Sequence, residues 1–194
     1  MPALAPERRQ RPPRSHVRDA LLAGKLPVTF PASEADTILP NPAPSVVYTE
    51  GLATGYRNKS AVAAFPFGHG LSYSTFGFSA PTSRQCAGFA LCVDVDVTNT
   101  GSVAAATVAQ AYVDLGPAAA HPAPPLKGFV KTPLLQPGDK HTATFQLTSR
   151  DVSYFDATAG KWVQGSVARV LLGASATDIK GETSFNLQPL VEQA

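Results

Sequence analysis

The chain has 194 residues and a formal net charge of +2, with 44% apolar and 15% charged residues, a composition typical of globular proteins. Eighteen prolines and fifteen glycines argue against a helical protein and favour short strands joined by turns. No apolar run is long enough to span a bilayer, and the chain as a whole lacks the basic excess of nucleic-acid-binding domains. Neither a membrane nor a nucleic acid is therefore expected as a partner.

The first 18 residues are unlike the rest of the chain. Residues 1–18 contain five arginines, one glutamate and four prolines. Organellar targeting peptides are also rich in arginine and poor in acids, but they are amphipathic and rich in serine. The prolines interrupt any helix, and Ser15 is the only serine of this stretch. We predict a disordered basic tail, with a targeting peptide or a polyanion-binding arm as the alternatives; the sequence assigns no cellular compartment.

A helix followed directly by a strand is predicted next. Ser15 can cap a short helix over residues 15–23, and Gly24 can end it. Residues 24–31 then alternate between apolar and other side chains, which is typical of a strand with a proline at its end. Residues 31–47 contain four prolines and no periodicity, so they are predicted to be an extended connector.

Alternation with period two dominates the second half of the chain. Leu91, Val93, Val95 and Val97 should point to one side of a strand and be buried. Asp94 and Asp96 should share the opposite, solvated face. Similar apolar alternation recurs at residues 109–114, 143–147, 167–172 and 179–187. With turn signals between them, these runs predict an all-β fold, an antiparallel sandwich.

The chain contains two cysteines, Cys86 and Cys92. Five intervening residues, including Gly88, would let a turn bring the two thiols together outside a reducing compartment. A single pair is no disulfide framework, so two free thiols are equally compatible with the sequence. Neither cysteine has a histidine at metal-ligand spacing, and no metal site is predicted.

Several motifs together resemble one family, the family-three glycoside hydrolases. GKLPVTFP (24–31) resembles the end of that family's α/β-sandwich domain, and YTEGLATGYR (48–57) and FPFGHGLSY (65–73) resemble the motifs that lead out of it. VDVTNTGSVAAATVAQAYVD, PPLKGF, LQPGD and SYFDATAGKWV then follow in the order of the family's terminal fibronectin-type-III-like domain. The resemblance covers about residues 19–187.

This resemblance implies a domain organisation in four parts. Residues 1–18 form the basic tail, residues 19–31 a remnant of the α/β-sandwich domain, residues 32–76 a linker that carries the motifs, and residues 77–190 a fibronectin type III-like (immunoglobulin-like) antiparallel sandwich. The strand of the α/β remnant would lack its sheet neighbours. Leu26, Val28 and Phe30 are therefore expected to be far more exposed than the sandwich valines.

The resemblance also implies a function for the parent enzyme. Family members are retaining glycosidases that act on β-linked glucosides, xylosides or related sugars, with two carboxylates about 5 Å apart. The family's nucleophile and acid/base precede the GKLP-type segment and have no counterpart in this sequence. We therefore predict no catalytic, cofactor-binding or metal-binding residue, and a stabilising role beside the enzyme's catalytic domains. A β-linked oligosaccharide is a further candidate partner, and a carbohydrate-binding or protein-interaction module is the alternative function.

Single residues within the motifs allow two interpretations each. Glu50 could be catalytic, but a lone carboxylate near Arg57 is better explained by a salt bridge or a loop hydrogen bond. His69 could face a sugar, but without a nucleophile or metal partner it is better explained as part of a buttress between domains.

Two further candidates concern the surface. Trp162 and Tyr154 could stack on a sugar ring, although the single tryptophan of a small sandwich more often lies in the core or plugs a hairpin. Asn58-Lys59-Ser60 matches the glycosylation sequon, which has meaning only in a secreted protein.

Overall fold

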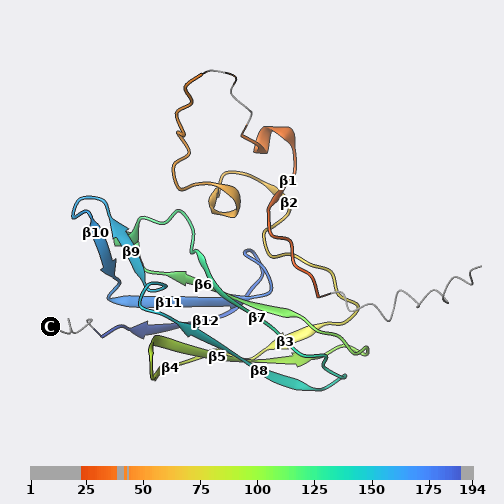
Figure 1. Ribbon diagram of the computed structural model, residues 1–194. Helices are drawn as coiled ribbons and strands as arrows, with labels where there is room; N and C mark the ends of the chain where they lie inside the picture. Colours follow the sequence, from red (N-terminus) through yellow and green to blue (C-terminus); the bar gives the residue numbers. More distant parts are fainter. Residues whose placement is uncertain (1–22, 39–41, 43, 189–194) are drawn as a thin grey trace, which may run out of the picture.

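The fold is an antiparallel β-sandwich with an N-terminal segment that lies against one side of it (Figure 1). The structure is a computed structural model that describes residues 23–38, 42 and 44–188. The all-β sandwich predicted from the alternation is confirmed. The predicted basic tail and, apart from Ala23, the predicted helix at residues 15–23 lie outside the described residues.

The first sheet is built around its longest strand, β5 (Phe89–Asn99). Antiparallel to β5, β8 (Lys140–Leu147) pairs along one side. β3 (Phe76–Phe78) and β4 (Thr82–Cys86) pair with successive parts of the other side. β5 is therefore the central strand of its sheet, which explains why its inward side chains have the clearest alternation in the sequence.

The second sheet has the strand order β12-β11-β6-β7. Its strands are β6 (Val108–Asp114), β7 (Leu126–Lys131), β11 (Val167–Gly173) and β12 (Ile179–Asn186). A short 3-10 turn, η4 (Pro117–Ala119), follows β6. Between β8 and β11 the chain forms a separate hairpin of β9 (Ser153–Asp156) and β10 (Lys161–Gln164).

The core lies between the two sheets and is lined by the residues that the alternation predicted. The exposed fractions of Leu91, Val93, Val95 and Val97 are 0%, 0%, 2% and 0%. Facing and neighbouring strands contribute Ala109, Ala111, Val113, Ala143, Phe145, Leu147, Ala168, Val170 and Leu172. Small side chains on β6 opposite larger ones on β5 and β8 let the layers approach closely.

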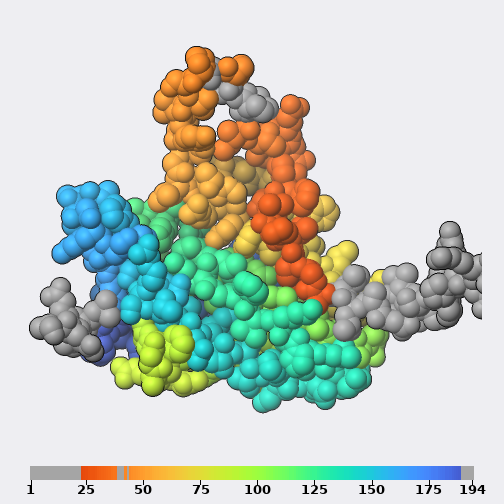
Figure 2. Space-filling view, in the orientation of Figure 1, coloured from red at the N-terminus to blue at the C-terminus, as the bar shows by residue number. Residues whose placement is uncertain are grey.

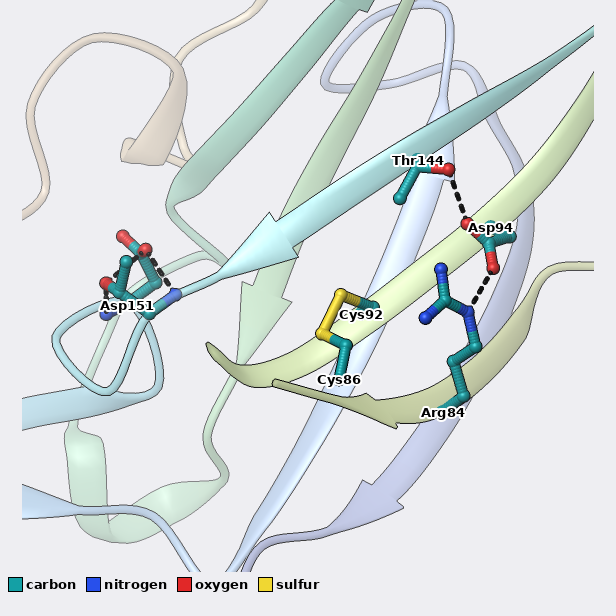
Figure 3. The surroundings of a disulfide bond; sticks show 7 residues. Arg84, Cys86, Cys92, Asp94, Thr144 and Asp151 are labelled. Atoms are coloured by element: carbon teal, nitrogen blue, oxygen red, sulfur yellow. Dashed lines mark hydrogen bonds and ion pairs between the residues drawn. A yellow bond between two sulfur atoms is a disulfide. The ribbon is translucent and has the colours of Figure 1, made fainter. Parts of the chain in front are cut away.

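Asp94 and Asp96 lie on the opposite, solvated face of β5, as predicted. Asp94 accepts hydrogen bonds from Arg84 Nε (2.8 Å) and Thr144 Oγ1 (2.6 Å), as Figure 3 shows. The bonds from Arg84 and then Thr144 hold the pKa of Asp94 below its usual value. Asp96 is bonded in the same way by Thr142 and Lys140. These cross-strand pairs link β4, β5 and β8 on the outside of the sheet.

Cys86 and Cys92 form a disulfide, the alternative that the sequence left open (Figure 3). The bond joins the end of β4 to β5 across the turn at Gly88, which has a φ of +80°. Cys92 lies on the same outward side of β5 as Asp94, yet only 1% of it is exposed because the disulfide and the turn cover it. The tip of this hairpin is therefore rigidly closed.

Residues 24–73, which we call the strap, leave the sandwich and return to it (Figure 2). The strap contains two short strands, β1 (Phe30–Pro31) and β2 (Ala63–Phe65), which pair with each other. It also contains two 3-10 turns, η2 (Glu34–Asp36) and η3 (Gly55–Arg57). The described part of the predicted connector is thus not wholly extended, since η2 lies within it.

The strand predicted over residues 24–31 is shorter than expected. Leu26 exchanges backbone hydrogen bonds with Gly68 and His69, at 2.9 and 2.8 Å. The chain bends at Pro27 and Val28, so regular pairing resumes only at Phe30. The expected exposure is confirmed for Val28 (52%) and Phe30 (47%), whereas Leu26 is half-buried.

Replacing Val95 by alanine should lower the free energy of unfolding by about 1–3 kcal/mol, because it leaves a cavity between the sheets. Denaturant unfolding followed by circular dichroism measures the change. Val47→Ala is the matched control, since Val47 is 79% exposed and its truncation should change the free energy by less than about 0.5 kcal/mol. Equal effects of the two substitutions would contradict the assignment of Val95 to the core.

Candidate functional site

The strap meets the sandwich at a buried polar contact centred on Gln110. Its Nε2 donates hydrogen bonds to the carbonyl oxygens of Gly68 (3.0 Å) and Ala174 (2.9 Å). Its Oε1 accepts a hydrogen bond from the hydroxyl of Tyr112 (2.7 Å). Gln110 is 3% exposed, so these bonds satisfy a carboxamide that burial would otherwise penalise. One side chain thereby joins the strap, β6 and the turn between β11 and β12.

Aromatic rings cover this contact. Tyr56, from η3, stacks on Phe67 with ring centroids 4.5 Å apart and meets Tyr112 edge-on at 6.0 Å. The amide of Leu126, at the start of β7, donates to the Tyr56 hydroxyl (2.8 Å). Burial, and secondarily the charge of Tyr56, raise the pKa of Tyr112, which therefore stays a neutral hydrogen-bond donor. Both long motifs of the strap thus pack on the outer face of the second sheet.

The two glycines of the FPFGHG motif are required by close approaches. Gly68 has a φ of +78°, and a Cβ there would collide with the carboxamide of Gln110. A Cβ at Gly70 would collide with the carbonyl oxygen of Gly24. The motif therefore lies tightly between the sandwich on one side and the beginning of the strap on the other.

His69 contributes its backbone to this arrangement. Its carbonyl accepts from the Leu26 amide, and its amide donates to Pro66 O (3.1 Å). The imidazole lies 5.8 Å from the ring of Phe65, between centroids. These contacts agree with a buttress, and no catalytic partner of His69 is found among the residues the structure describes.

An apolar groove lies on the outer side of the strap. Leu26, Phe30, Phe65 and Leu71 line a volume of about 580 Å³ together with Lys25 and His69. Phe30 and Phe65 meet edge-on at 6.5 Å. Burial lowers the pKa of Lys25, and the charge of Asp178 partly opposes this effect. No described residue of the groove carries a carboxylate, so the groove lacks the groups that glycoside hydrolysis requires.

The remaining candidates from the sequence are scattered. For Glu50 a salt bridge or a loop hydrogen bond was expected. Within the described chain Glu50 forms no ion pair with Arg57, whose Nη2 donates to Thr54 Oγ1 (3.2 Å). The carbonyl of Glu50 accepts a loop hydrogen bond from the Ala53 amide (2.9 Å). Asn58 of the sequon accepts hydrogen bonds from the amide and hydroxyl of Ser60 in a tight turn.

Trp162 lies on the β9–β10 hairpin and is 48% exposed, so of the two favoured positions, core or hairpin, the core is excluded. It meets Phe155 edge-on, and the guanidinium of Arg150 lies over its ring at 3.2 Å. Tyr154 instead packs against the core. The two aromatic residues therefore do not form a common platform.

Gln110 is the residue that the sequence analysis missed. The alternation over residues 109–114 places Gln110 on the side of the strand opposite Ala109 and Ala111, and nothing more could be said of it. A polar residue that faces water and one that is covered by a distant segment follow the same alternation, so the sequence alone carried no signal for the difference.

Neither a metal site nor a membrane-spanning helix is found in the part of the chain that the structure describes. Across residues 23–38, 42 and 44–188, no group of three metal-ligating side chains comes together. Over the same ranges, no helix is long and apolar enough to cross a membrane.

Comparisons with known proteins point to one group of enzymes. Residues 107–176 match the family described as fibronectin type III-like domain. The Probable beta-glucosidase L of Neosartorya fischeri is 39% identical over 88% of this chain, and a Beta-glucosidase of Rhizobium radiobacter is 36% identical over 85%. These matches cover 26% and 22% of the two relatives, so the chain spans about a quarter of their length.

Solved structures give the same result in three dimensions. The Beta-D-glucoside glucohydrolase of Trichoderma reesei superposes with a TM-score of 0.80 and 31% identity, over 88% of this chain and 27% of that enzyme. The GH3 beta-glucosidase of Bifidobacterium adolescentis superposes with a TM-score of 0.74 and 33% identity, over 89% and 28%. The similarity therefore includes the strap as well as the sandwich.

Gly68→Ala should destabilise the protein by about 1–3 kcal/mol more than Gly138→Ala, as judged by denaturant unfolding. Both glycines have a positive φ, of +78° and +87°, but a Cβ at Gly138 meets open space. The control therefore carries the same backbone strain without the collision against Gln110. Equal losses would mean that the contact between strap and sandwich is loose.

The free energy of unfolding should fall in acid because of His121. Burial lowers its pKa, and so do the nearby charges of Lys127 and Arg57, against an opposing effect of Asp114. Its Nδ1 is buried without a hydrogen-bond partner among the described residues. A histidine whose pKa is lowered in the folded state contributes its full stabilisation at pH values above its pKa in the unfolded chain, about 6.5. This contribution is lost as the pH falls from there toward the pKa of the folded state.

His121→Asn should therefore reduce the loss of unfolding free energy between about pH 7.5 and about pH 5.5. Urea unfolding at the two pH values measures the loss in both proteins. An identical pH dependence of the variant and the original chain would exclude His121 as the titrating group.

Proposed function

The chain belongs to glycoside hydrolase family 3, as its C-terminal portion, and we propose that it stabilises a β-glucosidase without contributing catalytic residues. Relatives of this portion are named beta-glucosidases, which supports hydrolysis of terminal β-glucosidic bonds as the activity of the whole enzyme. A β-linked oligosaccharide is then the substrate of that enzyme. The family's two carboxylates would come from the catalytic domains that precede this portion.

The observation that carries the proposal is the apolar outer side of the strap. Leu71 is 74% exposed, Phe65 51% and Phe30 47%, and all three line one groove. Contiguous apolar surface of this kind marks an interface. The α/β-sandwich domain of the same enzyme is the partner we propose for it, because the strap carries the motifs that lead out of that domain.

Docking through the strap explains how a domain without catalytic groups can serve catalysis. Gln110 and the stacked rings of Tyr56 and Phe67 fix the strap on the sandwich. A partner bound in the groove would then be held by the whole sandwich rather than by a flexible tail. The domain would contribute by restricting motion of its partner, since catalytic carboxylates must be held at a defined separation.

A stand-alone carbohydrate-binding module is the second candidate. It would be favoured by a row of exposed aromatic rings on one sheet face. Phe129, Phe155 and Trp162 are exposed, but they come from an edge strand and a separate hairpin. The apolar groove therefore favours the stabilising role.

A graft into a characterised relative tests the proposal. In one variant of the Neosartorya fischeri enzyme, the portion that matches this chain is deleted. In a second variant, the same portion is replaced by residues 23–194 of this chain. Hydrolysis of an aryl β-glucoside and the Tm are measured for both variants. The deletion should abolish activity, and the graft should restore it. Phe65→Asp with Leu71→Asp in the graft should reduce activity by more than about tenfold, because charges would be buried at the interface.

Gln146→Asp is the matched control, since it places a new charge on the exposed outer face of β8. The isolated chain should show no hydrolysis above background. Full activity of the deleted enzyme would contradict the stabilising role. Hydrolysis by the isolated chain, lost on Glu50→Gln, would contradict the assignment of Glu50 as non-catalytic.

A further inference from the structure

A second pocket lies between the turn that joins β4 to β5 and the end of β12. These two segments lie at the same end of the sandwich (Figure 1). The volume of the pocket is about 570 Å³, within the range of roughly 300–1,000 Å³ that is usual for small-molecule sites. Four separate parts of the fold line it: the β4–β5 turn, Ser149 after β8, Gln164 on β10, and Phe185 and Gln188 at the end of β12. No residue of the strap or of its groove takes part.

The walls of this pocket are fixed before any ligand arrives. The disulfide closes the turn that carries Phe89, and Figure 3 shows it bridging the two strands beneath that turn. Phe185 packs against the core. Beside it, the amide of Leu187 donates to Ser166 O (2.9 Å), which ties the end of β12 to the start of β11. A site that is already ordered loses little entropy on binding.

The polar groups of the pocket are neutral amides. Three glutamines line it: Gln85, Gln164 and Gln188. Gln164 Nε2 donates to the carbonyl of Gln188 (2.8 Å). Gln164 Oε1 is buried, and no described residue donates a hydrogen bond to it. Gln164 thus holds the end of β12 in place, and the exposed side chains of Gln85 and Gln188 are left to bind a ligand.

The lining defines the chemistry of the ligand. None of the ten lining residues has a side chain that titrates, because Cys86 is held in the disulfide, so a charged ligand would find no partner. Each carboxamide offers two donors and one acceptor oxygen, which suits hydroxyl groups that both donate and accept. Phe89, which is 37% exposed, and Phe185 offer apolar ring surface to the C–H face of such a molecule.

We propose that this pocket binds a neutral saccharide, at a place separate from the strap and its groove. The hydroxyl groups of the sugar would exchange hydrogen bonds with the exposed carboxamides of Gln85 and Gln188. The inference goes beyond the proposed stabilising function; only the choice of a β-linked glucose oligomer as probe rests on that function. A domain with this pocket would hold an oligosaccharide near the enzyme without hydrolysing it.

Titration of the full ¹⁵N-labelled chain with cellotriose tests the proposal by NMR. Side-chain amide signals of Gln85, Gln164 and Gln188, and the backbone amide of Phe89, should shift and saturate with one Kd below about 10 mM. Gln188→Ala should weaken binding about tenfold, the effect of one lost hydrogen bond in a site of this kind.

Gln85→Ala is a second variant, because Gln85 is exposed at the edge of the sheet and its truncation leaves the core intact. It should also weaken binding severalfold. Gln136→Ala is the matched control, because Gln136 lies outside the pocket. It lies in the turn before β8, whereas Ser149 of the pocket lies beyond the other end of that strand. This substitution should leave the Kd unchanged.

Absence of saturable shifts at the pocket would overturn the proposal. So would an unchanged Kd in both glutamine variants, or shifts confined to Trp162 and Phe155 on the hairpin. Because the titration uses the chain alone and involves no turnover, its outcome is independent of the graft experiment.

Discussion

The buried carboxamide of Gln110 is the contact on which the arrangement of this protein depends. It lies on the outer face of β6, where a polar side chain would ordinarily meet water. Here it is covered by Gly68, and its three hydrogen bonds reach Gly68, Ala174 and Tyr112. A buried amide tolerates few alternative positions of its partners, because each displaced partner leaves a polar atom unpaired. The orientation of the strap, and with it the apolar groove, follows from this one contact.

The sequence predicted the sandwich well because each strand there faces a dry core on one side and solvent on the other. In β5 the valines and aspartates alternate without a break, so both the strand and its register could be read from the chain. The family motifs predicted in the same way that residues 24–73 lead into the sandwich. The short pairing of β1 was not foreseen, because the chain bends at Pro27 and Val28 within a stretch whose side chains alternate correctly.

Contacts between distant segments could not be predicted. Gln110 and Gly68 are 42 residues apart, and neither residue type indicates on its own that it meets the other. The same holds for the saccharide pocket, whose glutamines come from β4, β10 and the end of β12. For Cys86 and Cys92 the sequence allowed either state, and only the hairpin geometry joins them. What sequence patterns encode is the environment of each strand, whereas these sites arise from how the strands are assembled.

The sandwich is a stable unit of its own. The strap is attached to it through the contact centred on Gln110, and the apolar side of the strap is left for a partner. Native-state hydrogen exchange of the full chain tests this claim most directly. The amides of Leu26 and Ala32, bonded only within the strap, should exchange through openings of much lower free energy than those of Val93 and Val95, which should approach the global stability. Equal protection in the two regions would contradict the account, because the strap would then be an integral part of the folded unit.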